Sequence, residues 1–157
     1  MIKTRIIESG EPQADHLEQF KQYASVPDDS RDGVLQKMLK RAMLAVQEHS
    51  DTAILPCKIE LTVTDVQPGE TVRLYQGGSD VLSATDQDGN AVAFAREGDR
   101  LRIQQRCAAL VVVYQNTVNT PEAEALQPVI WQLATAIYDG EDAKVQAAIL
   151  KTTYGML

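Results

Sequence analysis

Hydrophobic residues along the chain follow a helical period, then an alternating period, then a helical period again. In residues 29–50 apolar positions recur at spacings of three and four, which predicts a long helix with one buried stripe: Val34, Leu35, Met38, Leu39, Ala42, Met43 and Val46. Pro27 disfavours an earlier start, and we expect Asp28 or Asp29 to cap the helix. A shorter helix is expected before it, opened near Pro12.

Alternation with period two begins after Pro56. Ile59, Leu61 and Val63 alternate with polar residues, which predicts a strand with one solvent-exposed face. Turn residues separate further short strands expected at 72–74, 81–85, 91–95 and 101–105. Residues 108–114 are apolar without alternation, so we expect a strand that is covered on both faces and lies centrally in the sheet.

Helical periodicity returns at Thr120, which we expect to cap a helix that has Pro121 at its first position and continues to Tyr138. Asp139 and Gly140 end it, and a last helix is expected over residues 141–153.

The order of elements predicts the fold class. Runs of helices and strands are segregated, as in α+β proteins. We expect two N-terminal helices (the second long), five or six short and mainly antiparallel strands, and two C-terminal helices packed with the N-terminal pair. The 157 residues, 44% of them apolar, suffice for one domain. Within it, residues 1–50 form a helical hairpin, 51–115 a strand-rich segment and 116–157 the C-terminal helices.

Composition restricts the function classes. Lys and Arg number 15 against 22 Asp and Glu, a net charge of −7, which argues against a duplex-DNA binder held by phosphate contacts. No apolar stretch is long enough for a signal peptide or a membrane helix, so we expect an unsecreted protein with no membrane partner. Cys57 and Cys107, expected to be free buried thiols, and His16 and His49, expected to be solvated or to cap helices, are too sparse for a zinc site.

Two acidic groups invite a metal-binding interpretation. The first, Asp28, Asp29 and Asp32, stands at a helix start, where capping is the better interpretation. The second, residues 86–90, resembles a calcium loop but has its glycine two positions early and no closing glutamate, so we interpret it as a hairpin turn. No catalytic set, metal site or cofactor site is predicted.

Charged residues form three groups on the expected surface. The long helix carries Lys37, Lys40 and Arg41, the last hairpin carries Arg96 and Arg100 with two further arginines, and the acidic group comprises Glu122, Glu124 and Asp139. Each group is either a solvated face or a contact with the opposite charge on another copy. Basic and acidic faces on different sides permit a head-to-tail contact, which gives a ring when it closes.

The arrangement resembles the head-tail connector (adaptor) family of tailed bacteriophages. The short and long helices carry its pattern of an apolar residue, an aromatic residue and three spaced aspartates, an LP step begins the strands, an apolar strand ending in tyrosine closes them, and a proline opens the final helix. The matching residues are Leu17, Phe20, Val26, Asp28, Asp29, Asp32, Leu35, Ala42, Val46, Leu55, Pro56, Val111 to Tyr114, and Pro121 to Tyr138.

The resemblance implies a non-enzymatic structural protein of the virion, present in the host bacterial cytoplasm during assembly. Its partners would be other copies of itself in a ring of about a dozen, the portal protein and a tail-completion protein. DNA would pass through the ring without sequence-specific binding. The outer charges of the long helix and of Glu122 and Glu124 would set the contacts between neighbours.

Two alternatives remain at this point. The first is a monomeric or dimeric module that binds a peptide or small ligand through the strand-rich segment, in a pocket lined by Tyr75 and Phe94 and beside edge strands between residues 72 and 95. The second is an enzyme whose site is assembled from scattered carboxylates, which requires a cleft with two carboxylates of raised pKa.

Overall fold

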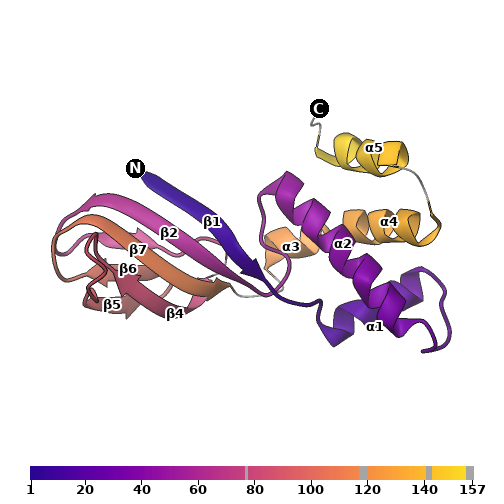
Figure 1. The fold of residues 1–157 in the computed structure, drawn as a ribbon, viewed down its shortest axis with the longest axis horizontal. Helices are drawn as coiled ribbons and strands as arrows, with labels where there is room; N and C mark the ends of the chain where they lie inside the picture. Colours follow the sequence, from indigo (N-terminus) through magenta and orange to yellow (C-terminus); the bar gives the residue numbers. More distant parts are fainter. Residues whose placement is uncertain (77, 117–119, 141–142, 155–157) are drawn as a thin grey trace. The chain divides into compact units, whose positions relative to one another are not determined.

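The chain forms two compact units, which this computed structural model describes for residues 1–76, 78–116, 120–140 and 143–154. One unit contains residues 1–9 and 56–118 and is built of strands (Figure 1). The other contains residues 10–55 and 119–157 and is built of helices. The predicted α+β class is confirmed.

The strand unit contains two antiparallel sheets. The four-stranded sheet has the order β1 (Ile2–Ser9), β2 (Cys57–Val66), β7 (Cys107–Asn116) and β4 (Gly78–Thr85). The three-stranded sheet has the order β3 (Thr71–Arg73), β6 (Arg100–Ile103) and β5 (Phe94–Glu97). β7 lies between β2 and β4, so its predicted central position is confirmed.

The core of the strand unit comes from alternate residues of its strands. Leu61 of β2 pairs with Val112 of β7, which in turn pairs with Ala84 of β4, and this row is buried. Leu101 and Ile103 are the buried residues of β6. Because successive side chains of a strand point to opposite faces, the buried residues of β2 and β7 share one face. The other face is polar along β2, whereas along β7 it carries the half-buried Val111 and Val113.

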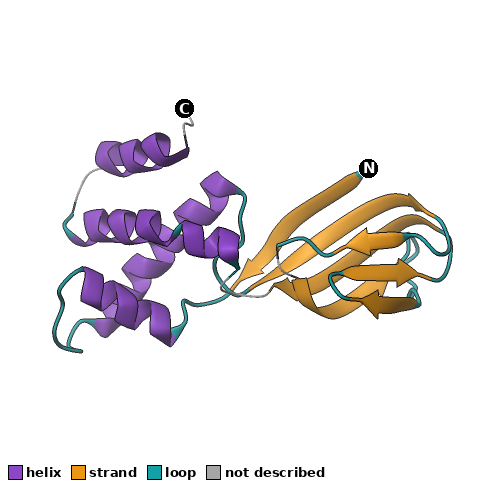
Figure 2. Ribbon diagram, turned by 180° about the vertical axis from the view of Figure 1, so that it is seen from behind, coloured by secondary structure: helices purple, strands orange, loops and turns teal. Residues whose placement is uncertain are grey.

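Residues 2–9 form a strand, which corrects the expectation of a purely helical segment over residues 1–50. β1 pairs with β2 from Ile2↔Val63 to Ser9↔Cys57 and lies at one margin of its sheet (Figure 2). None of its residues is fully buried, so the hydrophobic pattern carries little sign of it. Pairing with residues 48 to 61 positions later in the chain produces this element.

The helical unit contains α1 (Ala14–Tyr23), α2 (Asp32–Ser50), α3 (Pro121–Ala125), α4 (Gln127–Tyr138) and α5 (Ala143–Tyr154). Most of the predicted stripe of α2 packs in one core with α4, where Leu35, Leu39 and Leu133 are at most 1% exposed. The exceptions are Val34, which is 51% exposed in the first turn of α2, and Met38, which is half-buried. The Phe20 ring stacks on the Trp131 indole at 6.0 Å between centroids. Burial of these faces supplies most of the stability that such helices have.

The helix termini differ from the expectation in two places. The helix predicted from Thr120 to Tyr138 is two helices separated at Leu126, because Pro128 lacks the N–H that a continuous helix requires and instead opens α4. Thr120 Oγ1 accepts a hydrogen bond from Ala123 N at 3.2 Å and caps α3. Arg31, with no side-chain capping bond, precedes α2.

Cys57 and Cys107 are both free and buried. They begin adjacent strands, but β2 and β7 run antiparallel, so Val66 pairs with Cys107 while Cys57 lies at the opposite end. At about 3.4 Å per residue, nine residues separate the two rows by about 30 Å, so the thiols are far apart.

Across the described residues, no helix combines the length and the apolar character needed to cross a membrane.

Candidate interaction surfaces

A buried ammonium group links the first two helices. Lys21 is 5% exposed, and its Nζ lies 2.5 Å from Asp29 Oδ1, 2.9 Å from Asp32 Oδ1 and 3.8 Å from Glu18 Oε1. Hydrogen bonds to Asp29 and Asp32 hold the pKa of Lys21 well above its usual value. An oxygen of each of the three carboxylates lies within 4.8 Å of the others, and the Lys21 ammonium is the cation that all three contact.

The aspartates before α2 therefore have roles other than capping. Asp29 binds Lys21, and Asp28 Oδ1 accepts from Ser30 Oγ at 2.6 Å and from Ser30 N at 3.0 Å. These hydrogen bonds lower the pKa of Asp28. The expected capping role fails because α2 begins at Asp32, one short turn later. Lys21 was not predicted from the sequence as a functional residue. Its position next to Phe20, on the buried side of α1, was the signal that could have indicated a buried lysine.

The three basic residues predicted on the long helix differ in availability. Lys37 and Arg41 are exposed on α2. Lys40 is half-buried, and its Nζ forms an ion pair with Glu11 Oε1 at 2.6 Å. Lys37 and Arg41 are thus the members of this basic group whose charges are available to a neighbouring molecule.

The two predicted arginines of the strand unit also differ. Arg96 is used internally, because its Nε donates to Gly98 O at 2.7 Å and its Nη atoms donate to the carbonyls of Gly78 and Ser79. Arg100 is exposed on the outer face of β6. Its neighbours there are neutralised: Arg73 pairs with Asp99 and Arg102 pairs with Glu97. Arg100 is therefore the available cation of this face.

The acidic group lies on the helical unit. Glu122 and Glu124 are exposed in the first turn of α3, and Asp139 is exposed just after α4. The helical unit holds seven basic and thirteen acidic residues, whereas the strand unit holds eight and nine. The negative charge of the chain is consequently concentrated in the helices.

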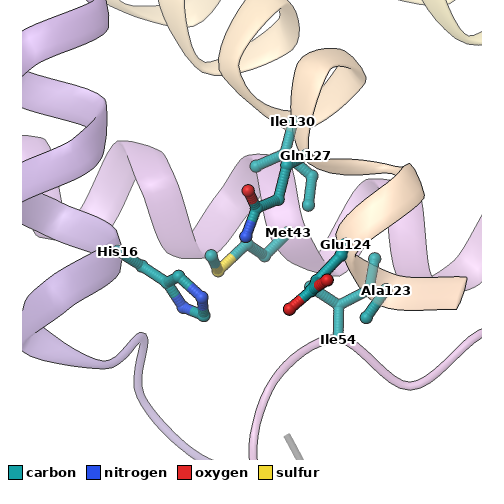
Figure 3. A pocket seen from close by; sticks show the side chains of 7 residues that line it. All are labelled: His16, Met43, Ile54, Ala123, Glu124, Gln127 and Ile130. Atoms are coloured by element: carbon teal, nitrogen blue, oxygen red, sulfur yellow. The ribbon is translucent and has the colours of Figure 1, made fainter. Parts of the chain in front are cut away.

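A small pocket opens in the helical unit between α1, α2, α3 and α4 (Figure 3). Its cavity volume is only about 10 Å³, and it is lined by the apolar side chains of Met43, Ile54, Ala123 and Ile130 and by the polar side chains of His16, Glu124 and Gln127. A cavity of this size holds about one water molecule, so it is not a ligand site.

His16 is a buried residue, which corrects its expected solvated or capping role. It is 6% exposed, and its ring meets the edge of the Trp131 indole at 6.4 Å between centroids. His49 Nδ1 lies 2.9 Å from Ala45 O, at the end of α2. Residues 86–90 form the expected turn, in which Asp86 Oδ1 accepts from Asp88 N and Asn90 N at 2.9 Å.

The comparisons with known proteins show that this chain shares its fold with solved structures. No protein-family model matches the sequence, and no curated protein does. Solved structures do match. A chain of the "Virion of native gene transfer agent (GTA) particle" is 15% identical, with a TM-score of 0.52 over 85% of this chain and 84% of that chain. A chain of the "Neck of empty GTA particle computed with C6 symmetry" is 13% identical, with a TM-score of 0.53 over 86% and 84%.

A third solved chain, from the "Neck of native GTA particle computed with C12 symmetry", is 14% identical, with a TM-score of 0.51 over 86% of this chain and 83% of that chain. At these identities the likeness shows the fold alone. That fold agrees with the resemblance to the head-tail connector family.

Proposed function

We propose that the chain is a non-enzymatic structural subunit of the neck of a phage-like particle, where copies form a ring between the portal protein and a tail-completion protein. The observation that carries this proposal is the fold shared with one virion chain and two neck chains over at least 85% of this chain. The symmetry in the names of two of those structures, C6 and C12, supports a closed ring of identical subunits. The protein would accordingly reside in the virion, after assembly in the bacterial cytoplasm.

The charge distribution supports a head-to-tail contact between copies. Lys37, Arg41 and Arg100 are exposed and form no ion pair among the described residues, while Glu122 and Glu124 are exposed on α3. Opposite charges on different surfaces favour a heterologous contact rather than a two-fold one. We assign these residues, with Asp139, to the contacts between neighbours.

The overall negative charge suits a channel for DNA. A net charge of −7 on each subunit repels phosphates, so DNA slides past instead of adhering. In the proposal, DNA crosses the ring without base-specific contacts. The ring's part in packaging is then to keep the channel open and to join head to tail.

The test is the mass of the purified chain in solution, measured by light scattering with and without portal rings. We expect species many times the 17.3 kDa subunit, at higher protein concentration or on portal rings. Arg41→Glu should weaken assembly, and added salt should weaken it as well, because both reduce attraction between exposed charges. Lys144→Glu on α5 is the control of equal charge change. A chain that stays monomeric at every concentration and does not bind portal rings contradicts the proposal.

A further inference from the structure

We infer that the free edge of β1 is a docking surface for an extended segment of another protein, a strand whose apolar residues alternate with polar ones and which has one acidic residue opposite Lys3. The inference goes beyond the ring: it concerns one edge of the strand unit and holds whether or not copies assemble. It rests on three features of that edge, which are its backbone groups, its uncovered face and its charge.

The backbone groups of alternate β1 residues point away from the sheet. Thr64 N donates to Met1 O at 3.2 Å, which makes this pair a hydrogen-bonded one. In an antiparallel ladder such pairs alternate with pairs whose peptide groups point outward. The N–H and C=O groups of Ile2, Thr4 and Ile6 therefore line the free edge, where an added strand would find donors and acceptors at regular spacing.

The isoleucines on the inner face of β1 are more exposed than the core residues beside them in the sheet. Ile2 is 55% exposed, although Val63 and Leu110, which continue its row across the sheet, are 8% and 0% exposed. Ile6 is half-buried beside Ile59, which is 1% exposed. The side chains of a strand added at this edge would lie next to these isoleucines and extend the core.

The opposite edge of the same sheet is occupied at both of its ends. Val92 N donates to Ala84 O at 2.9 Å at one end of β4, and Arg96 donates to the carbonyls of Gly78 and Ser79 at the other. Within the described part of the four-stranded sheet, β1 is thus the edge that offers a full row of groups. Exposed edges of this length are usually blunted or paired in native proteins.

Charge selects the occupant. Lys3 is exposed and has no ion pair among the described residues, whereas Arg5 pairs with Glu60 at 3.0 Å. A second β1 fits poorly, because antiparallel pairing centred on Thr4 sets Lys3 opposite Arg5, and parallel pairing in register sets like residues side by side. A strand with an acidic residue opposite Lys3 and apolar residues opposite Ile2 and Ile6 would pair with the lysine, pack against the two isoleucines and bond the outward backbone groups.

The probe is a blocked, fluorescein-labelled peptide of the sequence Thr-Val-Thr-Val-Glu-Val-Thr, whose binding to the full chain is followed by anisotropy. Thr4→Pro removes one outward N–H and spares the ladder with β2, a position where edge strands accept proline. Ile2→Lys places a charge on the uncovered face. Each variant should weaken peptide binding by roughly tenfold or more. Leu82→Lys, on β4 at the opposite margin of the sheet and 51% exposed in the wild type, should change it by less than about twofold.

A peptide with Lys in place of Glu should bind at least about fivefold more weakly than the probe. The inference is overturned if no binding is detected up to about 1 mM peptide, or if both β1 variants bind as the wild type does. It is also overturned if either variant breaks an assembly of the chain alone, since the edge would then be a contact between copies. Mass measurements on the same variants keep this outcome separate from the ring proposal, which the loss of peptide binding alone leaves intact.

Discussion

Gln47 holds the segment that follows α2. Its Oε1 accepts hydrogen bonds from Ile54 N at 3.0 Å and from Leu55 N at 3.3 Å, and the residue is 5% exposed. Gln47→Met keeps the length of the side chain and removes the acceptor. A buried donor that loses its partner costs about 1–3 kcal/mol, and the second hydrogen bond, which is longer and therefore weaker, adds about 1 kcal/mol. The apolar side chain recovers about 1 kcal/mol, so we expect a net loss of about 1–3 kcal/mol.

The assay is urea unfolding followed by the fluorescence of Trp131, the single tryptophan, which lies in the core of the same unit. The matched control is Gln132→Met on the exposed face of α4, which should change the free energy of unfolding by less than about 0.5 kcal/mol. A Gln47→Met protein as stable as this control would refute the reasoning, because the two backbone donors would then have found other partners at no cost.

Three further predictions concern the strand unit. Gly78→Ala should cost about 1–3 kcal/mol in urea unfolding followed by circular dichroism, because a Cβ there meets the Tyr114 ring at 2.8 Å; Gly33→Ala, with nothing within 4 Å, should be neutral or stabilising by up to about 1 kcal/mol. Burial raises the pKa of Tyr114 to about 12, so the unfolded chain loses this proton first and the free energy of unfolding should fall as pH rises from about 10 to about 12. A Tyr114→Phe protein with an unchanged slope in that range would contradict this. Burial raises the pKa of Cys57 to about 11, so a thiol reagent at pH near 8 should modify Cys57 slowly in the folded protein and both cysteines quickly in urea. A mild oxidant should give no disulfide within the chain, and a Cys57–Cys107 bond in a folded monomer would show that the strand register is wrong.

The elements that sequence could predict are those whose signal is local. The stripe of α2 and the alternation of β2 each follow from burial of one face. The expectation that residues 108–114 are covered on both faces is wrong, because β7 buries one face while Val111 and Val113 on the other face are only half-buried. The turn at residues 86–90 follows from its own side chains and its glycine. These predictions needed no knowledge of the tertiary fold.

The features that sequence could not predict depend on distant partners. β1 is a strand because β2 pairs with it, and its exposed residues leave no pattern of burial. His16 is buried because Trp131, more than a hundred residues later, covers it. The charged residues chosen as a surface group divide into available ones, such as Arg41, and internally paired ones, such as Lys40, only once their neighbours are known. Local patterns carry no such information.

The separation of β1 from its partner affects how the chain is made. Arg5 and Glu60, which face each other in the sheet, are 55 positions apart, so a ribosome must deliver the whole helical hairpin before the first strand can find its place. Closing a loop of that length adds an entropic cost that grows only slowly with length. Until β2 has been synthesised, β1 is an unpaired segment that contains three isoleucines. Nascent chains at high concentration would be most prone at that stage to pair β1 with the wrong strand.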